Sequence, residues 1–281
     1  QDAPAMRIAT LFLLPKCDLA CRFCGSELGF AALSEAEALQ FVEFAAGHGY
    51  GSVVFGGGEP LLWRGDLLRL GARAREVGLV VQLNTNGVEW RDELESSPEI
   101  DRIILPLDGA TAESHDYLRS PQGGHRSIIE DRLTRLCAIG KQVTIGSVIC
   151  SFNRDELPLL SEELNRLVAG GLRLHAWHLY CFRAIGRGGA AKGRGSELGL
   201  DQQEFRMLCE PIQAEPRPWK VYRRPDMTRS RDVDFFWFEG GGWKASGFGA
   251  ATQYIAGAGS LCGESSPLHL ASAHRRPSDN E

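Results

Sequence analysis

The sequence predicts an α/β fold: a partial, TIM-like (β/α)6 barrel followed by a C-terminal extension. Short apolar runs alternate with amphipathic stretches along the first two thirds of the chain. Strand and helix repeat about every 25–40 residues, as in βα units that build a parallel sheet. Polar or glycine-rich clusters follow the apolar runs, and ligands in such folds bind at the carboxyl ends of the strands. We therefore expect these clusters to line one cavity.

Six apolar runs have the length and bounding residues of buried strands. The predicted strands are Ile8–Leu14, Ser52–Phe55, Val80–Asn84, Arg102–Leu107, Gln142–Cys150 and Arg173–Phe182. Amphipathic segments between them predict helices, and Ser34 with Glu37 three residues later forms a capping box. The predicted helices are Ser34–Gly47, Gly65–Val77, Arg91–Ser97, Ser127–Ile139 and Asp155–Ala169.

The pattern changes after Arg183, so we expect the barrel to span residues 6–185 and the extension residues 186–281. Residues 186–198 are glycine-rich and basic, which is typical of a linker or a lid. Asp201–Cys209 predicts a short helix. Residues 233–262 predict a hairpin that turns at Gly-Gly-Gly.

Composition narrows the choice of partners. The 281 residues carry 31 Lys and Arg against 36 Asp and Glu, a formal net charge of −5. DNA and anionic membranes bind clustered positive charge, so we expect neither as a partner. No apolar run reaches the roughly 18 residues of a membrane span, and we interpret Ile8–Leu14 as a buried strand rather than part of a secretory leader. We expect a cytoplasmic protein.

Three of the eight cysteines, Cys17, Cys21 and Cys24, lie in one loop directly after the first predicted strand. The others are scattered, which is a poor disulfide framework for a chain of this size and favours a reducing compartment. Three thiolates can hold three irons of a cubane cluster or three positions on zinc. A structural zinc needs a fourth ligand nearby, and the sequence offers none. The spacing favours a [4Fe–4S] cluster with one open iron, and structural zinc or buried cysteines without a metal are the alternatives.

The run from Cys17 to Cys24 resembles the C-x3-C-x2-C signature of the radical S-adenosylmethionine (radical SAM) superfamily, in which an aromatic residue, here Phe23, precedes the third cysteine. The resemblance implies that SAM chelates the open iron. An electron from a reducing donor, of flavodoxin or ferredoxin type, would then cleave SAM to methionine and a 5′-deoxyadenosyl radical. That radical would abstract a hydrogen atom from the substrate.

Residues Gly57 to Pro60 are similar to the GGEP motif of that superfamily. Glycines let the backbone approach a ligand closely. The resemblance implies that Gly57 and Gly58 lie against SAM and that the Glu59 carboxylate accepts a hydrogen bond from its ammonium group. A glycine-rich turn alone is weak support, but this one follows the second predicted strand and the cysteine loop.

Later strand ends extend the resemblance, which covers roughly residues 8–185. Asn84 or Asp108 would bind the ribose hydroxyls of SAM, and Arg119 would pair with its carboxylate. Ser147 is a further polar candidate. The alternatives are turn-capping side chains and a surface arginine. Many relatives have a serine two residues before this Asp, where the chain has Pro106.

The last predicted strand of the barrel offers candidate catalytic residues. Period-two alternation places Cys181 on one face and His178 and Tyr180 on the other, and one face should point into the barrel. We consider a substrate role for His178 and Tyr180, and a hydrogen-donor or radical-quenching role for the Cys181 thiol. The alternative is that these side chains belong to the core.

The segment from Ile185 to Gly188 resembles the bridge into the twitch or SPASM extension of peptide-modifying members. Only Cys209 and Cys262 follow it, too few for auxiliary clusters. In its size and its lack of further cysteines the chain is instead similar to viperin-like nucleotide-modifying enzymes or small natural-product tailoring enzymes. Basic residues could receive substrate phosphates or form a surface linker; they are Arg183, Arg187, Lys192, Arg194, Lys220, Arg223 and Arg224.

Two classes of function remain open. The first is a radical SAM enzyme that tailors a small molecule, nucleotide or peptide, with a viperin-like nucleotide triphosphate dehydratase as one version. The second is a non-catalytic iron–sulfur or zinc protein. A carboxylate placed to bind methionine favours the enzyme, because a sensor has no use for it.

Overall fold

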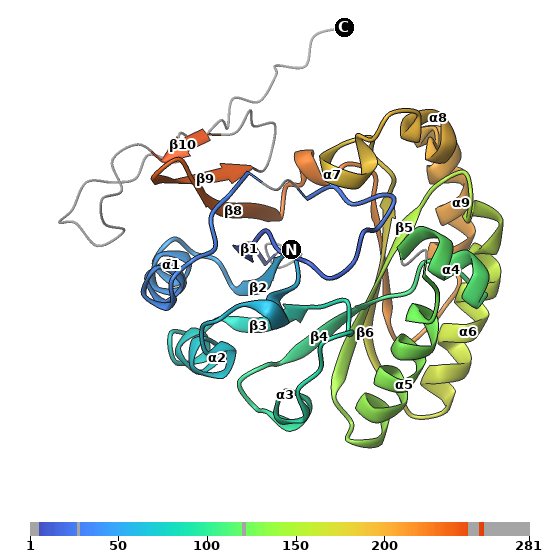
Figure 1. Ribbon diagram of the computed structural model, residues 1–281. Helices are drawn as coiled ribbons and strands as arrows, with labels where there is room; N and C mark the ends of the chain where they lie inside the picture. Colours follow the sequence, from blue (N-terminus) through green and yellow to red (C-terminus); the bar gives the residue numbers. More distant parts are fainter. Residues whose placement is uncertain (1–5, 27–28, 120–121, 247–252, 256–281) are drawn as a thin grey trace, which may run out of the picture.

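A curved, largely parallel sheet forms the centre of the computed structural model, which describes residues 6–26, 29–119, 122–246 and 253–255 (Figure 1). The sheet has ten strands in the order β10-β9-β8-β1-β2-β3-β4-β5-β6-β7. Pairing is parallel from β8 through β7, and β9 and β10 add antiparallel strands at one edge. The strands are β1 Ile8–Leu14, β2 Ser52–Gly57, β3 Val80–Asn84, β4 Arg102–Pro106, β5 Gln142–Ile149, β6 Arg173–Cys181, β7 Lys220–Arg224, β8 Val233–Glu239, β9 Gly242–Ser246 and β10 Gln253–Ile255.

The longer helices cover the outer face of this sheet (Figure 1), whereas the short α7 and α8 bond the cysteine loop. The helices are α1 Glu35–Gly47, α2 Leu67–Glu76, α3 Asp92–Ser96, α4 Ala112–Arg119, α5 His125–Ala138, α6 Leu157–Ala169, α7 Gly186–Gly189, α8 Arg194–Leu198 and α9 Gln202–Ala214. Single 3-10 turns are η1 Pro60–Leu62, η2 Arg154–Glu156 and η3 Met227–Arg229. No helix among the described residues is long and apolar enough to cross a membrane.

The predicted α/β partial barrel is confirmed, and β1 and β3 have the predicted bounds. The capping box of α1 also forms, because Ser34 Oγ accepts from Glu37 N at 3.3 Å and Glu37 Oε2 accepts from Ser34 N at 2.7 Å. Helix α4 is not among the predicted helices, and it begins at Ala112, a few residues after the end of β4.

The residues after 185 join the same sheet at both ends. Strand β7 pairs with β6, and β8 pairs with β1. A boundary near residue 185 stays a prediction. Residues 186–198, which the sequence assigns to a linker or a lid, contain the short helices α7 and α8. The predicted hairpin forms from β8 and β9, where Gly240 and Gly241 have φ of 63° and 80°, the signs that a two-residue turn requires. Residues 247–252 and 256–262 of the predicted segment, Cys262 among them, lie outside the described residues.

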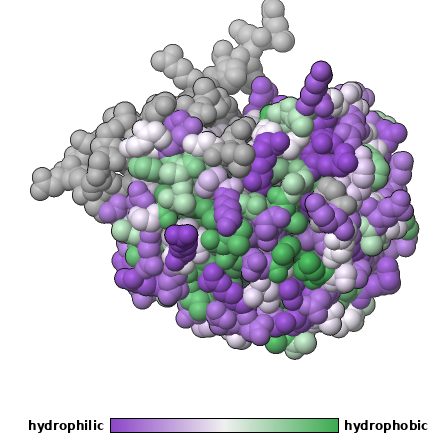
Figure 2. All heavy atoms as spheres, in the orientation of Figure 1, coloured by the Kyte–Doolittle hydropathy of each residue, from purple (hydrophilic) through white to green (hydrophobic). Residues whose placement is uncertain are grey.

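Alternation along β1 separates the core from an internal cavity. Ala9, Leu11 and Leu13 are fully buried in the main hydrophobic cluster, whereas Thr10 and Phe12 line the cavity. In the orientation of Figure 1, apolar residues show in the middle of the molecule and polar residues surround them (Figure 2). The sheet therefore has one face that packs under the helices and one face that is available to a ligand.

Candidate active site

The concave face of the sheet encloses a cavity of about 750 Å³. Its lining includes all three loop cysteines, Cys17, Cys21 and Cys24, together with Phe23 beside them. The prediction that the polar clusters after the strands line one cavity is thus correct for the first three strands. It is wrong for the fourth and fifth, which are followed by Asp108 and Asn153, because both side chains are fully buried and do not line the cavity.

Glu59 is a buried carboxylate in the cavity wall, only 1% exposed. Its Oε1 accepts from Leu61 N at 3.0 Å and from Thr85 Oγ1 at 2.7 Å, and its Oε2 accepts from Asn86 N at 2.7 Å. Burial raises the pKa of Glu59 to about 7, against the lowering effect of these hydrogen bonds. A carboxylate has about four acceptor positions, so one position remains for a donor in the cavity.

The two glycines of the motif bring β2 against the cysteine loop. Gly57 and Gly58 both line the cavity. Gly58 N donates to Leu14 O at 2.7 Å, and Glu59 N donates to Lys16 O at 2.8 Å. A Cβ on Gly58 would lie 2.0 Å from Lys16 O. Only glycine fits there, and this contact fixes the stem from which Cys17 follows.

Each loop cysteine receives a hydrogen-bond donor. Arg187 Nε lies 3.2 Å from Cys24 Sγ, and Asn86 Nδ2 lies 3.7 Å from Cys17 Sγ. Arg119 Nη1 lies 4.0 Å from Cys21 Sγ. Burial raises the pKa of the bare Cys21 thiol to about 11, against the lowering effect of Arg119. Donors aimed at sulfur suit thiolates that carry negative charge toward a metal centre.

The spread of the three sulfurs bears on which metal they fit. Thiolates on one zinc lie about 3.8 Å apart, from a Zn–S distance near 2.3 Å. Among the described residues, the one group of three potential ligand atoms within 4.8 Å of one another is His115, Asp116 and His125. The three cysteine sulfurs do not form such a group, so at least one pair of them lies more than 4.8 Å apart. Three cysteine thiols in one loop at the cavity wall are a donor set that suits an iron–sulfur cluster.

Arg119 lines the cavity, and Asp108 holds it from behind. Arg119 Nε donates to Asp108 Oδ2, and Asp108 Oδ1 accepts from Val148 N at 2.7 Å. The guanidinium also lies 4.9 Å from the centre of the Phe23 ring. The ribose role considered for Asp108 is therefore corrected: its carboxylate is fully buried and positions Arg119. Asn84, the other ribose candidate, does line the cavity.

Two other candidates point away from the cavity. Ser147 is fully buried, donates from Oγ to Leu107 O and accepts from Trp177 Nε1 at 2.8 Å. Cys181 belongs to the main hydrophobic core, with Sγ 3.9 Å from Leu200 O. Both side chains stand on the strand face that packs against the helices. The cofactor role of Ser147 and the hydrogen-donor role of Cys181 are therefore corrected.

His178 and Tyr180 do line the cavity, so the face of β6 that carries them is the one that points inward. Tyr180 Oη and His178 Nδ1 are 3.3 Å apart. Burial, with the nearby charge of Arg224 as the next contribution, lowers the pKa of His178 to about 3. The imidazole is therefore neutral at physiological pH. His178 and Tyr180 thus add two uncharged hydrogen-bonding groups to the cavity wall.

A family model described as the radical SAM superfamily matches residues 11–162. The match spans more than half of the 281 residues and includes the cysteine loop, the GGEP segment and Arg119. The chain belongs to the radical SAM superfamily. The family implies SAM and an iron–sulfur cluster, and the cysteine loop and Glu59 fit those groups.

Curated members of the superfamily are similar over part of their length. An AdoMet-dependent heme synthase of Oleidesulfovibrio alaskensis is 26% identical over 194 residues, which cover 66% of this chain and 48% of that protein. A PqqA peptide cyclase of Xanthomonas euvesicatoria is 30% identical over 167 residues, covering 56% and 43%. The chain thus spans about half the length of the curated relatives it matches.

Solved structures from the superfamily share the fold. Streptococcus suis SuiB bound to precursor peptide SuiA has a TM-score of 0.64 at 16% identity, covering 79% of this chain and 49% of SuiB. The structure of anSMEcpe with bound AdoMet has a TM-score of 0.54 at 15% identity, covering 73% and 57%. These values establish the open, parallel α/β sheet.

Sequence reasoning missed Asn86, which links three parts of this radical SAM site. Its amide N bonds Glu59, its Nδ2 donates to Asp18 Oδ1 at 2.6 Å, and its carbonyl oxygen lies 2.8 Å from His125 Nε2. The polar segment NTNG, Asn84 to Gly87, marks the end of the third predicted strand. Nothing in the sequence indicated which of its side chains turns toward the cysteines.

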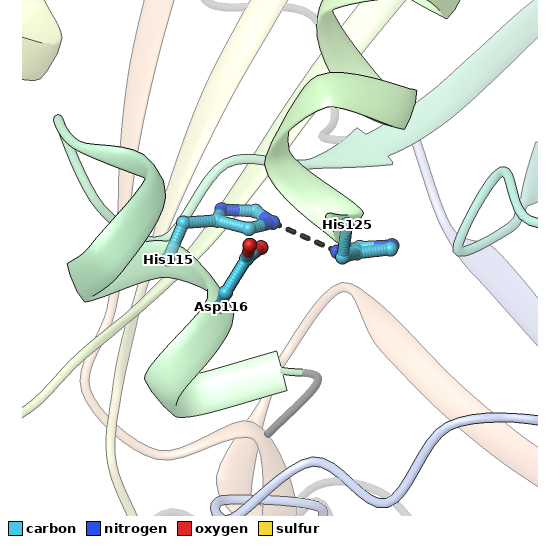
Figure 3. Close-up of side chains that lie close together, drawn as sticks. All are labelled: His115, Asp116 and His125. Atoms are coloured by element: carbon cyan, nitrogen blue, oxygen red, sulfur yellow. Dashed lines mark hydrogen bonds between the residues drawn. The ribbon is translucent and has the colours of Figure 1, made fainter. Parts of the chain in front are cut away.

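His115, Asp116 and His125 lie close together behind the site (Figure 3). Asp108 N donates to His115 Nδ1 at 3.1 Å, so His115 Nε2 carries the proton and donates to His125 Nδ1 at 2.8 Å. His125 Nε2 then donates to Asn86 O. Asp116 accepts from Gly124 N and Arg126 N at the start of α5. Every ring nitrogen is engaged, so the group is a hydrogen-bond relay, not a metal site.

Replacing Gly58 with alanine tests the close approach of β2 and the cysteine loop. Because the new Cβ would meet Lys16 O, we expect a loss of about 1–3 kcal/mol in the free energy of unfolding and less iron bound per chain after reconstitution. The control is Gly47→Ala, whose Cβ meets no atom within 4 Å. Equal iron content and stability in both variants would contradict this account.

The histidine relay predicts a pH-dependent stability difference. Burial lowers the pKa of His115 to about 2, below the 6.5 of an unfolded histidine, so the wild type loses stability as pH falls below 6.5. Glutamine at this position does not titrate. The stability advantage of the wild type over His115→Gln should shrink by about 1 kcal/mol between pH 7.5 and 5.5 in urea titrations. A constant difference, as expected for Gly47→Ala, would refute a neutral His115.

Proposed function

We propose that this chain is a radical SAM enzyme that modifies a peptide. Cys17, Cys21 and Cys24 would hold a [4Fe–4S] cluster, to which a flavodoxin- or ferredoxin-type donor would supply an electron. With SAM bound, the cluster would supply a 5′-deoxyadenosyl radical for abstraction of a hydrogen atom from the substrate. The single observation that carries the proposal is the convergence of the cysteine loop and the Glu59 carboxylate on one cavity.

The residues of the chain divide the work of binding SAM. Glu59 accepts a hydrogen bond from the ammonium group through its remaining acceptor position. Arg119 pairs with the SAM carboxylate, held in place by Asp108. Asn84 binds the ribose. The charged methionine end of SAM would thus meet side chains that the protein has already oriented. This lowers the free-energy cost of ordering those side chains on binding.

Two observations support a peptide as substrate. A curated relative is a PqqA peptide cyclase, and SuiB, which shares the fold, is solved with its precursor peptide. The cavity of about 750 Å³ is also large enough for a cofactor and a substrate side chain together.

A purely structural metal protein has no need of a buried carboxylate in a cavity wall, because burial of that group costs free energy.

Glu59→Gln tests the assignment of the ammonium-binding carboxylate. The variant loses the negative charge, so we expect SAM affinity to fall about tenfold or more, measured by calorimetry on the anaerobically reconstituted protein. Iron content, measured on the same samples, should stay near that of the wild type. Glu93→Gln, on the exposed side of α3, is the matched control. Unchanged SAM binding in Glu59→Gln would contradict the assignment.

A further inference from the structure

The wall of the cavity farthest along the sheet from Glu59 carries a cation with no acidic partner. Arg224, the last residue of β7, lines the cavity. No ion pair joins it to any acidic side chain among the described residues, and its Nε is buried without a hydrogen-bond acceptor. The guanidinium carbon lies 5.1 Å from the centre of the Tyr222 ring.

The other cations in the lining are already engaged. Arg119 pairs with Asp108, and Lys244 Nζ lies 2.6 Å from Glu239 Oε2. Arg187 donates to Cys24 Sγ. Within the described part of the wall, Arg224 is therefore the basic side chain that neither an acidic side chain nor a cysteine sulfur engages. A guanidinium buried at Nε without an acceptor is costly unless something binds there.

The neighbours of Arg224 are polar but uncharged. Strand pairing sets Tyr180 opposite Arg224 and His178 opposite Tyr222. The charge of Arg224 helps to keep His178 neutral, because it lowers the pKa of that imidazole in addition to the effect of burial. A group that binds here therefore meets one positive charge and a hydroxyl and imidazole that can hydrogen bond.

The charge on this wall fits one carboxylate better than a polyphosphate. A nucleoside triphosphate needs several cations or a metal at its phosphates. Of the basic residues that the sequence suggested for phosphates, only Arg187 and Arg224 line the cavity, and Arg187 faces sulfur. The phosphate role is corrected for the remaining members, Arg183, Lys192, Arg194, Lys220 and Arg223. Aromatic side chains, including Phe12, Phe235 and Trp237, fill much of the remaining lining.

We propose that Arg224 anchors a carboxylate of the peptide substrate, an acidic side chain or the C-terminal carboxylate, on the β6–β7 wall of the cavity. This inference rests on the proposed function. The planar guanidinium donates hydrogen bonds to both carboxylate oxygens, and Tyr180 and His178 border the same subsite. Holding the substrate at β7 orients it across the sheet from Glu59, so its remaining length extends toward the SAM end of the cavity.

Peptide binding to the reconstituted protein with SAM, measured by calorimetry, tests the anchor. The probes are Ac-AAEAA-NH2, which has only a side-chain carboxylate, Ac-AAQAA-OH, which has only a terminal one, and neutral Ac-AAQAA-NH2. We expect one acidic probe to bind at least about tenfold more tightly than the neutral probe. The acidic probe that binds more tightly identifies the source of the carboxylate.

Variants then assign the effect to Arg224. In Arg224→Gln the preferred acidic probe should lose about 10- to 100-fold in affinity, and Arg224→Lys should lose less because it keeps the charge. Arg223→Gln, on the same strand but outside the cavity lining, is the matched control and should change little.

Three results would overturn the anchor: no acidic probe binds the wild type, Arg224→Gln binds it as well as the wild type does, or ATP and CTP bind through Arg224 while the acidic probes do not. Failure of the proposed function is seen separately, as absence of SAM cleavage in the wild type without any peptide. The circular-dichroism spectrum and the iron content of Arg224→Gln, compared with those of Arg223→Gln, show whether the variant is folded.

Discussion

The site depends on one buried carboxylate. Glu59 is almost fully removed from water, and a charge in that position persists only with several hydrogen bonds. Its partners, Leu61 N, Thr85 Oγ1 and Asn86 N, come from the turn after β2 and from the segment after β3. Satisfying Glu59 therefore locks two strand ends together, and Glu59 N adds the stem after β1 through Lys16 O.

The same locking explains how the cysteine loop is held although it has no regular structure of its own. On one side Asn86 reaches Cys17 and Asp18. On the other, the turn of α7 donates from Gly188 N and Gly189 N to Cys24 O, at 3.0 and 3.2 Å. The loop is thus clamped between the third strand end and a segment more than 160 residues later in the chain. This geometry gives the segment after β6 a structural reason to be rich in glycine, since backbone must approach backbone there.

Elements whose formation depends on neighbouring residues could be predicted from the sequence. Apolar periodicity located β1 to β6, and the Ser34–Glu37 box located the start of α1. It did not find β7, and it could not show that β8, found as one arm of the hairpin, pairs with β1. These pairings join segments that are distant or separated by other elements along the chain. Side-chain alternation along β6 also left a question open. It puts Cys181 and His178 on opposite faces of the strand, but the sequence does not say which face points into the barrel. Asp108 was misassigned because its partner, Arg119, reaches it from a helix that the pattern did not reveal.

The central claim is that the three loop cysteines support SAM cleavage. The most direct measurement is anaerobic reconstitution with iron and sulfide, followed by dithionite and SAM, with 5′-deoxyadenosine read by chromatography. The account predicts product from the wild type and none from a variant with Cys17, Cys21 and Cys24 all replaced by alanine. No product from a wild-type protein that carries zinc in place of iron would contradict it and favour a structural metal site.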